Sequence, residues 1–378
     1  MKGIYLQIAL LVFFSLFSTL KGYNQTTANP EVYRAGYKVV RAVDSTRVYK
    51  PNSNTTDYLH YRPMDFDIWY PAKASSTDTI LAFKDFLGLL EERAIYYTAS
   101  DKWKGITGQV AQSFCEGFKC SDTARLFRFK TSSVKNAAPL KGKFPLVVYL
   151  TSYNGMGYEN IQLFEDLASK GFVVVSINSI GRYPGDMTMK NADLMEQVKD
   201  ADYAIQLLSK DEQVDITKIG IVGYSWGGLA GAILANRTPA AACLVSLDGS
   251  EFHHYGEAKQ ENEDFDETRN SKEFKAMHLN IPYLRLQSAP VNESNKDSVY
   301  DFTGKLLKDK TILIVDSADH QDFCYLPTLV RASGNCNNNS EYGTVTKLTE
   351  SFLEDHLKGK NEFADVLQSN LDKTVSKQ

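Results

Sequence analysis

The 378-residue chain has no excess of positive charge, since 42 Lys and Arg stand against 46 Asp and Glu and the formal net charge is −4. This balance gives no argument for nucleic acid as a partner, because phosphate backbones attract clustered basic residues. No spacing of Cys and His is typical of a zinc site, and no internal repeat occurs. Neither a metal nor an organic cofactor is implied. With 43% hydrophobic and 23% charged residues, the composition is that of an ordinary globular protein.

Long apolar runs are also missing, except at the N-terminus. The stretch "MKGIYLQIALLVFFSLFSTLKGYNQ" has Lys2, an apolar run from Ile4 to Leu20, and then polar residues. This order predicts a secretory signal peptide over residues 1–22 and export to the periplasm or the exterior. An uncleaved membrane anchor is the alternative, because the run is near the minimum length for a membrane span. We favour cleavage, since no basic cluster follows the run. Elsewhere we expect peripheral membrane contact at most.

Cysteine is scarce, and the five residues are Cys115, Cys120, Cys243, Cys324 and Cys336. Export permits disulfides, and an odd count leaves at least one thiol free or paired between chains. Cys243 lies in the apolar run "AAACLVSLD" and is predicted to be a buried strand residue. Local pairing predicts Cys115 with Cys120 and Cys324 with Cys336.

The order of elements predicts one α/β domain over residues 30–372. Strand-like stretches at 36–43 and 64–72 precede a helical block that starts at Phe83. From Phe144 onward, short apolar strands alternate with helices, which is typical of a mostly parallel sheet covered by helices on both faces. The predicted strands are 145–152, 171–178, 219–225, 242–248, 282–288 and 310–316. Ligand sites in such sheets lie at the carboxyl ends of the strands.

A charged segment at 251–280 interrupts this alternation. We interpret it as a solvated connection in preference to a lid over the substrate, although the sequence leaves both open.

The stretch "KIGIVGYSWGGLAG" places Ser225 between a strand and a helix, in the pattern G-x-S-x-G. A serine lifted above such a turn needs small residues two positions before and after it, because the strand and helix nearly touch there. Gly223 and Gly227 meet this need, and we expect Gly228 and Gly231 to keep the helix close to the sheet. A phosphate-binding loop is the alternative interpretation of this glycine-rich turn. Neither of its sequence patterns, G-x-x-x-x-G-K-[ST] and G-x-G-x-x-G, occurs in the chain.

A nucleophilic serine needs a base that an acid orients, and in this kind of site the chain order is Ser, Asp or Glu, then His. His320 directly follows the last apolar strand, in "ILIVDSADHQDF". The other histidines precede the serine or lie in the charged segment or the C-terminal helix, and we interpret them as ordinary surface residues: His60, His253, His254, His278 and His356. The candidate base is therefore His320.

The acid has two candidates. Asp248 ends the strand "ACLVSLD", whereas Glu293 lies in the loop after the following strand. We favour Asp248.

An oxyanion needs two backbone donors. The N–H of Trp226 at the start of the helix is one, and its position also benefits from the helix dipole. The second should come from the loop "YNGMGYEN", where Gly155 and Gly157 allow N–H groups to turn inward and Met156 is the candidate.

Together these residues resemble the α/β-hydrolases, and within them the platelet-activating-factor acetylhydrolases and dienelactone-hydrolase-like esterases. The resemblance runs from Tyr61 to Phe323 through "RPMDFDIWYPA", "FPLVVYLTSYNGMG", "LASKGFVVVSIN", "ITKIGIVGYSWGG", "SLD" and "DHQDF". It implies an acid on the strand that follows the nucleophile elbow, which is the strand-to-helix turn at Ser225, and a base in the stretch "DHQDF". This favours Asp248 and His320. The chain departs at Asn154, where those enzymes usually have histidine.

The sequence therefore predicts an exported serine hydrolase that cleaves a small-molecule or lipid carboxylic ester through an acyl-enzyme. A phospholipid-directed acetylhydrolase or lipase, a serine peptidase of the same fold and a non-catalytic binding protein are the alternatives. The identity of the acyl and alcohol groups and the oligomeric state are left open.

Overall fold

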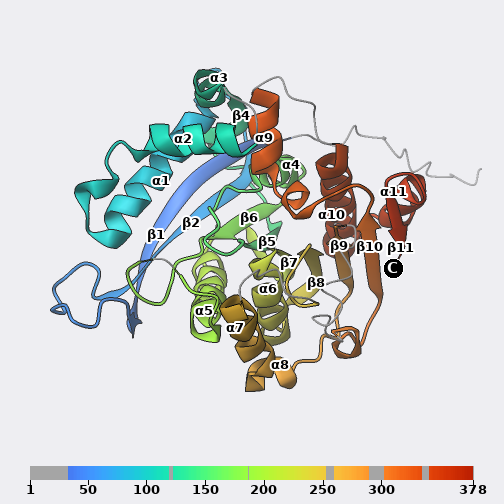
Figure 1. Ribbon diagram of the computed structural model, residues 1–378. Coiled ribbons are helices and arrows are strands. Elements are labelled where there is room, and N and C mark those ends of the chain that lie inside the picture. The colour runs from blue at the N-terminus through green and yellow to red at the C-terminus, as the bar shows by residue number, and fades with distance from the viewer. Residues whose placement is uncertain are drawn as a thin grey trace, which may run out of the picture. The chain divides into compact units, whose positions relative to one another are not determined.

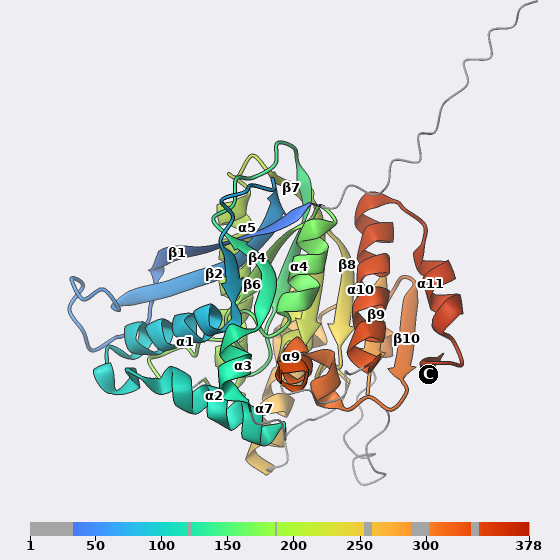
Figure 2. The ribbon, with the colours of Figure 1, turned by 90° about the horizontal axis from the view of Figure 1, so that it is seen from above.

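The computed structural model describes residues 33–118, 122–185, 187–252, 259–288, 302–333 and 340–377. Its centre is one sheet in the order β11-β10-β9-β8-β7-β5-β6-β2-β1-β4-β3 (Figures 1 and 2). The strands are β1 (Arg34–Val48), β2 (Tyr61–Ala72), β3 (Ile80–Ala82), β4 (Lys130–Lys135), β5 (Phe144–Leu150), β6 (Val173–Ile177), β7 (Val214–Tyr224), β8 (Ala241–Leu247), β9 (Tyr283–Gln287), β10 (Lys310–Val315) and β11 (Val375–Lys377).

Six neighbouring strands, from β6 to β10, pair in parallel, and antiparallel strands flank them on both sides. Helices connect them: α1 (Phe83–Thr98), η1 (Asp101–Trp103), α2 (Ile106–Gly117), α3 (Thr123–Arg128), α4 (Ile161–Ser169), α5 (Asn191–Leu208), α6 (Trp226–Arg237), α7 (Lys259–Asn270), α8 (Lys272–Lys275), η3 (Thr303–Lys305), η4 (His320–Phe323), α9 (Tyr325–Ser333), α10 (Ser340–Lys358) and α11 (Phe363–Asn370).

Both faces of the sheet are buried, and alternate side chains of a strand pack in two different hydrophobic clusters. In β5, Val147 and Tyr149 pack in one hydrophobic cluster, with α1, α4 and α10. Leu146 and Val148 pack in the other, with α5 and α6. Because side chains alternate along a strand, a sheet covered on both sides needs an unbroken apolar sequence. In Figure 1, α4 and α10 lie on one side of the sheet and α5 and α6 on the other.

The predicted α/β architecture is confirmed, and the long strands and helices from Phe144 onward lie within a few residues of their expected bounds. Three short strands were not expected from the sequence: β3, β4 and β11. The last of these pairs with β10, so the sheet extends past residue 372, the predicted end of the domain. The predicted leader, residues 1–22, lies outside the described residues. Within the described part of the chain, no helix is both long and apolar enough to cross a membrane.

The predicted local disulfides are wrong. Cys115 and Cys324 are buried free thiols, and Cys324 Sγ donates a hydrogen bond to a backbone carbonyl at 3.2 Å. Their expected partners, Cys120 and Cys336, lie outside the described residues. Cys243 is a fully buried residue of β8, as predicted.

Candidate active site

The carboxyl ends of neighbouring parallel strands bring the predicted residues to one edge of the sheet. Ser225 follows β7, Asp248 follows β8 and His320 comes after β10. The candidate oxyanion loop follows β5, which lies beside β7. Residues that are 95 positions apart in the sequence therefore meet because their strands are close in the sheet.

Ser225 sits on a strained turn between β7 and α6, with φ 54° and ψ −121°. A Cβ built on Gly223 would lie 2.1 Å from the Gly227 carbonyl oxygen, and one on Gly227 would lie 2.0 Å from the Leu150 carbonyl oxygen. Both contacts are with backbone, so no side chain can give way. In this structure there is room for glycine alone at these two positions.

The two later glycines differ from each other. A Cβ on Gly228 would lie 2.6 Å from the backbone of Gly249, whereas one on Gly231 would be 3.4 Å from its nearest neighbour, the Ile221 side chain. A Cβ at Gly228 would thus overlap its neighbours, although less severely than one at Gly223 or Gly227. The distance at Gly231 is that of an ordinary van der Waals contact, so the close packing expected of Gly231 does not depend on glycine.

Ser225, His320 and Asp248 form a continuous hydrogen-bonded chain. Nε2 of His320 lies 2.9 Å from Ser225 Oγ, and Nδ1 of the same ring lies 2.7 Å from Asp248 Oδ2. Asp248 is fully buried, whereas the His320 side chain is 32% exposed. Tyr224 stacks on the imidazole at 5.2 Å between ring centroids, and its hydroxyl donates to the His320 carbonyl oxygen at 2.9 Å. The imidazole is thus held by hydrogen bonds at both ring nitrogens and by Tyr224 on one face, and it stays partly exposed to solvent.

Burial alone would raise the pKa of Asp248, but its partners lower it to about 2. These partners are the hydrogen bond and charge of His320, the charge of buried Arg285 and the backbone N–H of Ser288. That N–H donates to Asp248 Oδ1 at 2.9 Å, and the Ser288 hydroxyl donates to Oδ2 at 3.0 Å. An acid held as carboxylate can orient an imidazole and stabilise its positive charge.

Ser288 and Arg285 were not predicted from the sequence. Arg285 lies in β9 and Ser288 directly follows this strand, and only the order of strands in the sheet places them beside β8. The sequence signal that could have identified Ser288 is its position: it is a polar residue directly after β9, the strand that follows Asp248 in the chain.

The competing acid, Glu293, lies outside the described residues, as do His253 and His254. His60, His278 and His356 are described, and none of them is among the hydrogen-bond partners of Ser225.

The oxyanion loop differs in detail from expectation. Gly155 and Gly157 have ordinary negative φ, and Asn154 takes the left-handed conformation with φ 52°. The N–H groups of both glycines are bonded inside the protein, to the Ser152 carbonyl and the Asn178 side chain, each at 2.8 Å. The two glycines are needed for space, because a Cβ on either would lie within 2.6 Å of a neighbouring oxygen.

Met156 lies between these two glycines, and within the described part of the chain its N–H has no acceptor. Trp226 is the first residue of α6, so its N–H has no acceptor within the helix. The assignment of these two groups as oxyanion donors stays a prediction.

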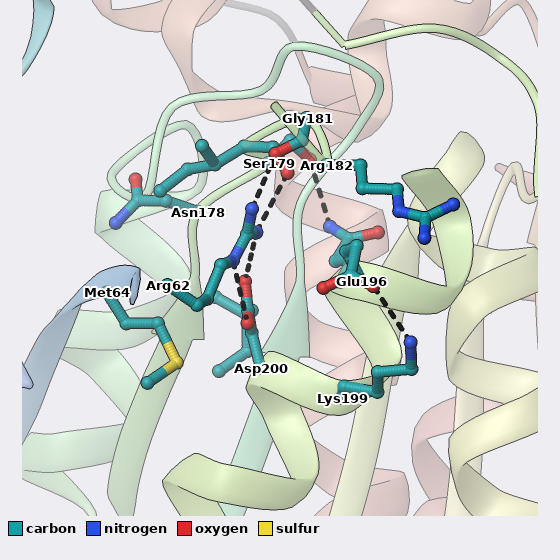
Figure 3. Close-up of polar contacts among 12 residues, drawn as sticks. Arg62, Met64, Asn178, Ser179, Gly181, Arg182, Glu196, Lys199 and Asp200 are labelled. Atoms are coloured by element: carbon teal, nitrogen blue, oxygen red, sulfur yellow. Dashed lines mark hydrogen bonds and ion pairs between the residues drawn. The ribbon is translucent and has the colours of Figure 1, made fainter. Parts of the chain in front are cut away.

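A buried ion pair supports the neighbouring loop after β6. Arg62 of β2 pairs with Asp200 of α5 at 2.6 Å and donates to the Gly181 carbonyl oxygen (Figure 3). In the same loop, the Ser179 hydroxyl donates to the carbonyl oxygen of Ser152 at 2.7 Å. The loop after β6 is therefore fastened both to the body of the sheet and to the candidate oxyanion loop.

The charged segment is partly described, because residues 253–258 lie outside the described part. Helix α7 is not wholly solvated: Phe265 packs edge-on against Trp226 at 5.4 Å, and Arg269 donates to the Ser250 carbonyl oxygen. One face of the segment thus packs beside the nucleophile elbow. In the described ranges, no group of three or more His, Cys, Asp or Glu is arranged to hold a metal ion.

Comparisons with known proteins agree with this architecture. A family model described as alpha/beta hydrolase fold matches residues 145–273. A protein of Bradyrhizobium sp named "Probable 2-oxo-3-(5-oxofuran-2-ylidene)propanoate lactonase" is 29% identical over 117 residues, which are 29% of this chain and 47% of that relative. The match thus spans about half the length of that protein. The structure of a ferulic acid esterase from Streptomyces cinnamoneus is similar with a TM-score of 0.58 and 20% identity, covering 87% of this chain and 91% of the other. The chain has the α/β-hydrolase fold.

Proposed function

We propose that this protein is an exported serine hydrolase that cleaves a carboxylic ester through an acyl-enzyme. The observation that carries the proposal is the chain of hydrogen bonds from Asp248 through His320 to Ser225, built on a strained strand-to-helix turn. A lone serine in a glycine-rich turn would not need a base at 2.9 Å and a buried acid behind it.

The mechanism follows from these positions. Ser225 Oγ attacks the carbonyl carbon while His320 Nε2 takes its proton, and Asp248 stabilises the imidazolium that results. The carbonyl oxygen becomes an oxyanion, which the N–H groups of Trp226 and Met156 hold. When the intermediate collapses, the ester bond breaks and His320 gives its proton to the leaving alcohol. Water then attacks the acyl-enzyme by the same route and releases the acid.

The substrate class we propose is a small-molecule carboxylic ester. The esterase structure with the same fold and the lactonase similar to part of the chain are both hydrolases of this bond type by name. A lactone is a cyclic ester, so the lactonase relative favours lactone hydrolysis as the second candidate. The resemblance to acetylhydrolases and dienelactone-hydrolase-like enzymes supports the same chemistry. Because acetylhydrolases of this kind act on lipid esters, the test also includes a lipid ester.

The test is hydrolysis by the purified protein of aryl esters with graded acyl length, alongside a lactone, a phospholipid and an acetylated sugar. The wild type should turn over at least one of these, and Ser225→Ala should lose the activity. Ser176→Ala is the matched control, because Ser176 is also a buried serine and lies in a strand of the same sheet. Equal turnover by the wild type and Ser225→Ala would refute the proposal.

Export is proposed on the N-terminal sequence alone. Expression with the full N-terminus in a bacterial host, followed by mass measurement of the secreted or periplasmic protein, tests it. A mature chain that starts near residue 23 would support export, whereas an uncleaved chain in the membrane fraction would support the anchor.

A further inference from the structure

We infer that Glu159 and Asn160 are positioning residues. They hold the candidate oxyanion loop and the segment that begins at His320 in fixed positions relative to each other. The inference rests on the proposed function, because it concerns how that reaction's groups are aligned. The two residues are consecutive, lie directly before α4 and are both buried. One reaches the loop after β5, and both reach the segment that follows His320.

The Glu159 side chain closes the loop after β5. Its Oε1 accepts hydrogen bonds from the Ser152 N–H and the Tyr149 hydroxyl, each at 2.9 Å, and its Oε2 accepts from the Ser152 hydroxyl at 2.6 Å. Gly155 lies against the same carboxylate, since a Cβ there would be 2.6 Å from Oε2. The loop that carries Met156 is therefore wrapped around this carboxyl group.

The Glu159 backbone binds the other segment. Its carbonyl oxygen accepts from the N–H groups of Tyr325 and Leu326, at 3.0 and 3.2 Å, and from Cys324 Sγ at 3.2 Å. These residues follow η4, which begins at His320.

Asn160 completes the link. Its Nδ2 donates to the Phe323 carbonyl oxygen at 3.0 Å and to the Tyr149 hydroxyl at 2.7 Å, and its Oδ1 accepts from the Tyr325 N–H at 2.9 Å. Tyr149 of β5 is thus shared between Asn160 and Glu159. A shift of either loop would break several of these bonds at once, so the base and the oxyanion donor move together or not at all.

The charge of Glu159 adds a second role. Burial raises its pKa to about 7, against the hydrogen bonds from Ser152 and Tyr149 and the charge of His320, which lower it. The titratable groups that face it are Tyr149 on β5, Cys324 ahead of α9 and His320 on η4. Because the interaction is mutual, an anionic Glu159 stabilises the imidazolium that forms when His320 takes the serine proton.

Glu165 provides a matched control. It is also a glutamate with 3% exposure, burial likewise raises its pKa to about 7, and it too accepts bonds from a serine hydroxyl and a backbone N–H, those of Ser133 and Ser132. It lies on α4 and binds β4, away from Ser225 and His320 in the sheet. A general cost of losing a buried glutamate will therefore be common to both residues.

The experiment compares kcat and KM of the wild type with those of Glu159→Ala, Glu159→Gln, Asn160→Ala and Glu165→Ala on the best ester of the panel. Glu159→Ala and Asn160→Ala should lower kcat by roughly 10- to 100-fold, the size expected for small misplacement of reacting groups, with little change in KM. Glu159→Gln keeps an acceptor for Ser152. Below pH 6 its kcat should therefore be close to that of the wild type and well above that of Glu159→Ala. It should fall behind the wild type above pH 8, where only the wild type carries the charge. Glu165→Ala should lower the melting temperature and keep the wild-type kcat.

If Glu159→Ala does not fold, Ser152→Ala removes one of the contacts without an internal cavity of that size and should lower kcat several-fold. Wild-type kcat and pH profile in both Glu159→Gln and Ser152→Ala would overturn the inference and leave the proposed function intact, as would an equal loss of turnover in Glu165→Ala. A wild type that hydrolyses no ester would overturn both.

Discussion

At the scale of single residues, two members of the candidate triad occupy backbone conformations that most residues avoid. Ser225 has φ 54° and Asp248 has φ 45°. Each costs of the order of 1 to 3 kcal/mol and persists only where the surroundings enforce it. Here the N–H of Ser225 donates to the Leu247 carbonyl at 3.0 Å, and the N–H of Asp248 donates to the Leu286 carbonyl at 2.7 Å. Strain at two adjacent strand ends indicates a site fixed before any substrate arrives.

Asp248→Asn should leave the fold intact and lower kcat by about 10³- to 10⁴-fold, because an amide cannot hold the His320 tautomer that accepts the serine proton. Steady-state kinetics on the best ester measures this loss. Glu293→Gln is the paired control and should keep nearly full turnover. If the glutamine variant loses the activity and the asparagine variant keeps it, the acid belongs to the later loop.

Residues with a local signature were predictable, and residues that act across strands were not. Ser225, Gly223 and Gly227 are marked by a spacing within five positions, and His320 by its place after the last parallel strand. Ser288 and Glu159 carry no such mark. Their roles depend on which strands are neighbours in the sheet and on which loops contact each other. A short stretch of sequence contains neither kind of information.

At the scale of elements, the contact between β5, β7 and α6 is the tightest constraint on the site. Gly227→Ala would place a Cβ against the Leu150 carbonyl and force α6 away from β5. We expect a loss of about 3 kcal/mol or more in the free energy of unfolding, as for overpacking in a core, together with loss of turnover. Gly231→Ala in the same helix has room and should be neutral or stabilising by up to about 1 kcal/mol.

Urea unfolding of the two variants, with turnover measured in parallel, decides this comparison. Equal stability of Gly227→Ala and the wild type would show that the elbow is looser than its geometry indicates. A large loss in Gly231→Ala would mean that α6 lies closer to the sheet than the structure places it.

The long elements were predictable because each has a clear period, and the short ones were not. Strands such as β5 and β6 are unbroken apolar runs that a two-sided sheet requires. β3 and β11 have three residues each, too few to show alternation, and they become strands only because β4 and β10 offer a free edge. The glycines of the oxyanion loop were identified for conformational freedom, whereas the structure shows that they are needed for space.

At the scale of the whole molecule, three buried carboxyl groups should shape the dependence of stability on pH. Burial raises the pKa of Glu159, Glu165 and Glu350 to about 7 from an ordinary 4.5. Between these values the folded state holds protons that the unfolded state releases, so the free energy of unfolding falls as pH rises through this window. Each group contributes up to about 3 kcal/mol of this fall.

Among the other groups with shifted pKa values, His356 and Asp248 behave differently from these glutamates. His356 on α10 opposes the trend, because desolvation lowers its pKa and the unfolded state then binds the extra proton. Asp248, with a pKa of about 2, loses its stabilising effect only below about pH 4 and is constant here.

Denaturant unfolding of the wild type and Glu165→Gln at pH 5 and pH 8 isolates one carboxyl group. The variant should lose less stability than the wild type between the two pH values. The same fall in both proteins would mean that Glu165 ionises normally.

The assignment of Ser225 as the nucleophile is tested most directly by labelling the protein with a fluorophosphonate and mapping the adduct by mass spectrometry. We predict one adduct per chain, on the peptide that contains Ser225, at a rate greatly reduced in His320→Ala and absent in Ser225→Ala. No adduct on the folded wild type, or an adduct on a different serine, would show that Ser225 is not the nucleophile.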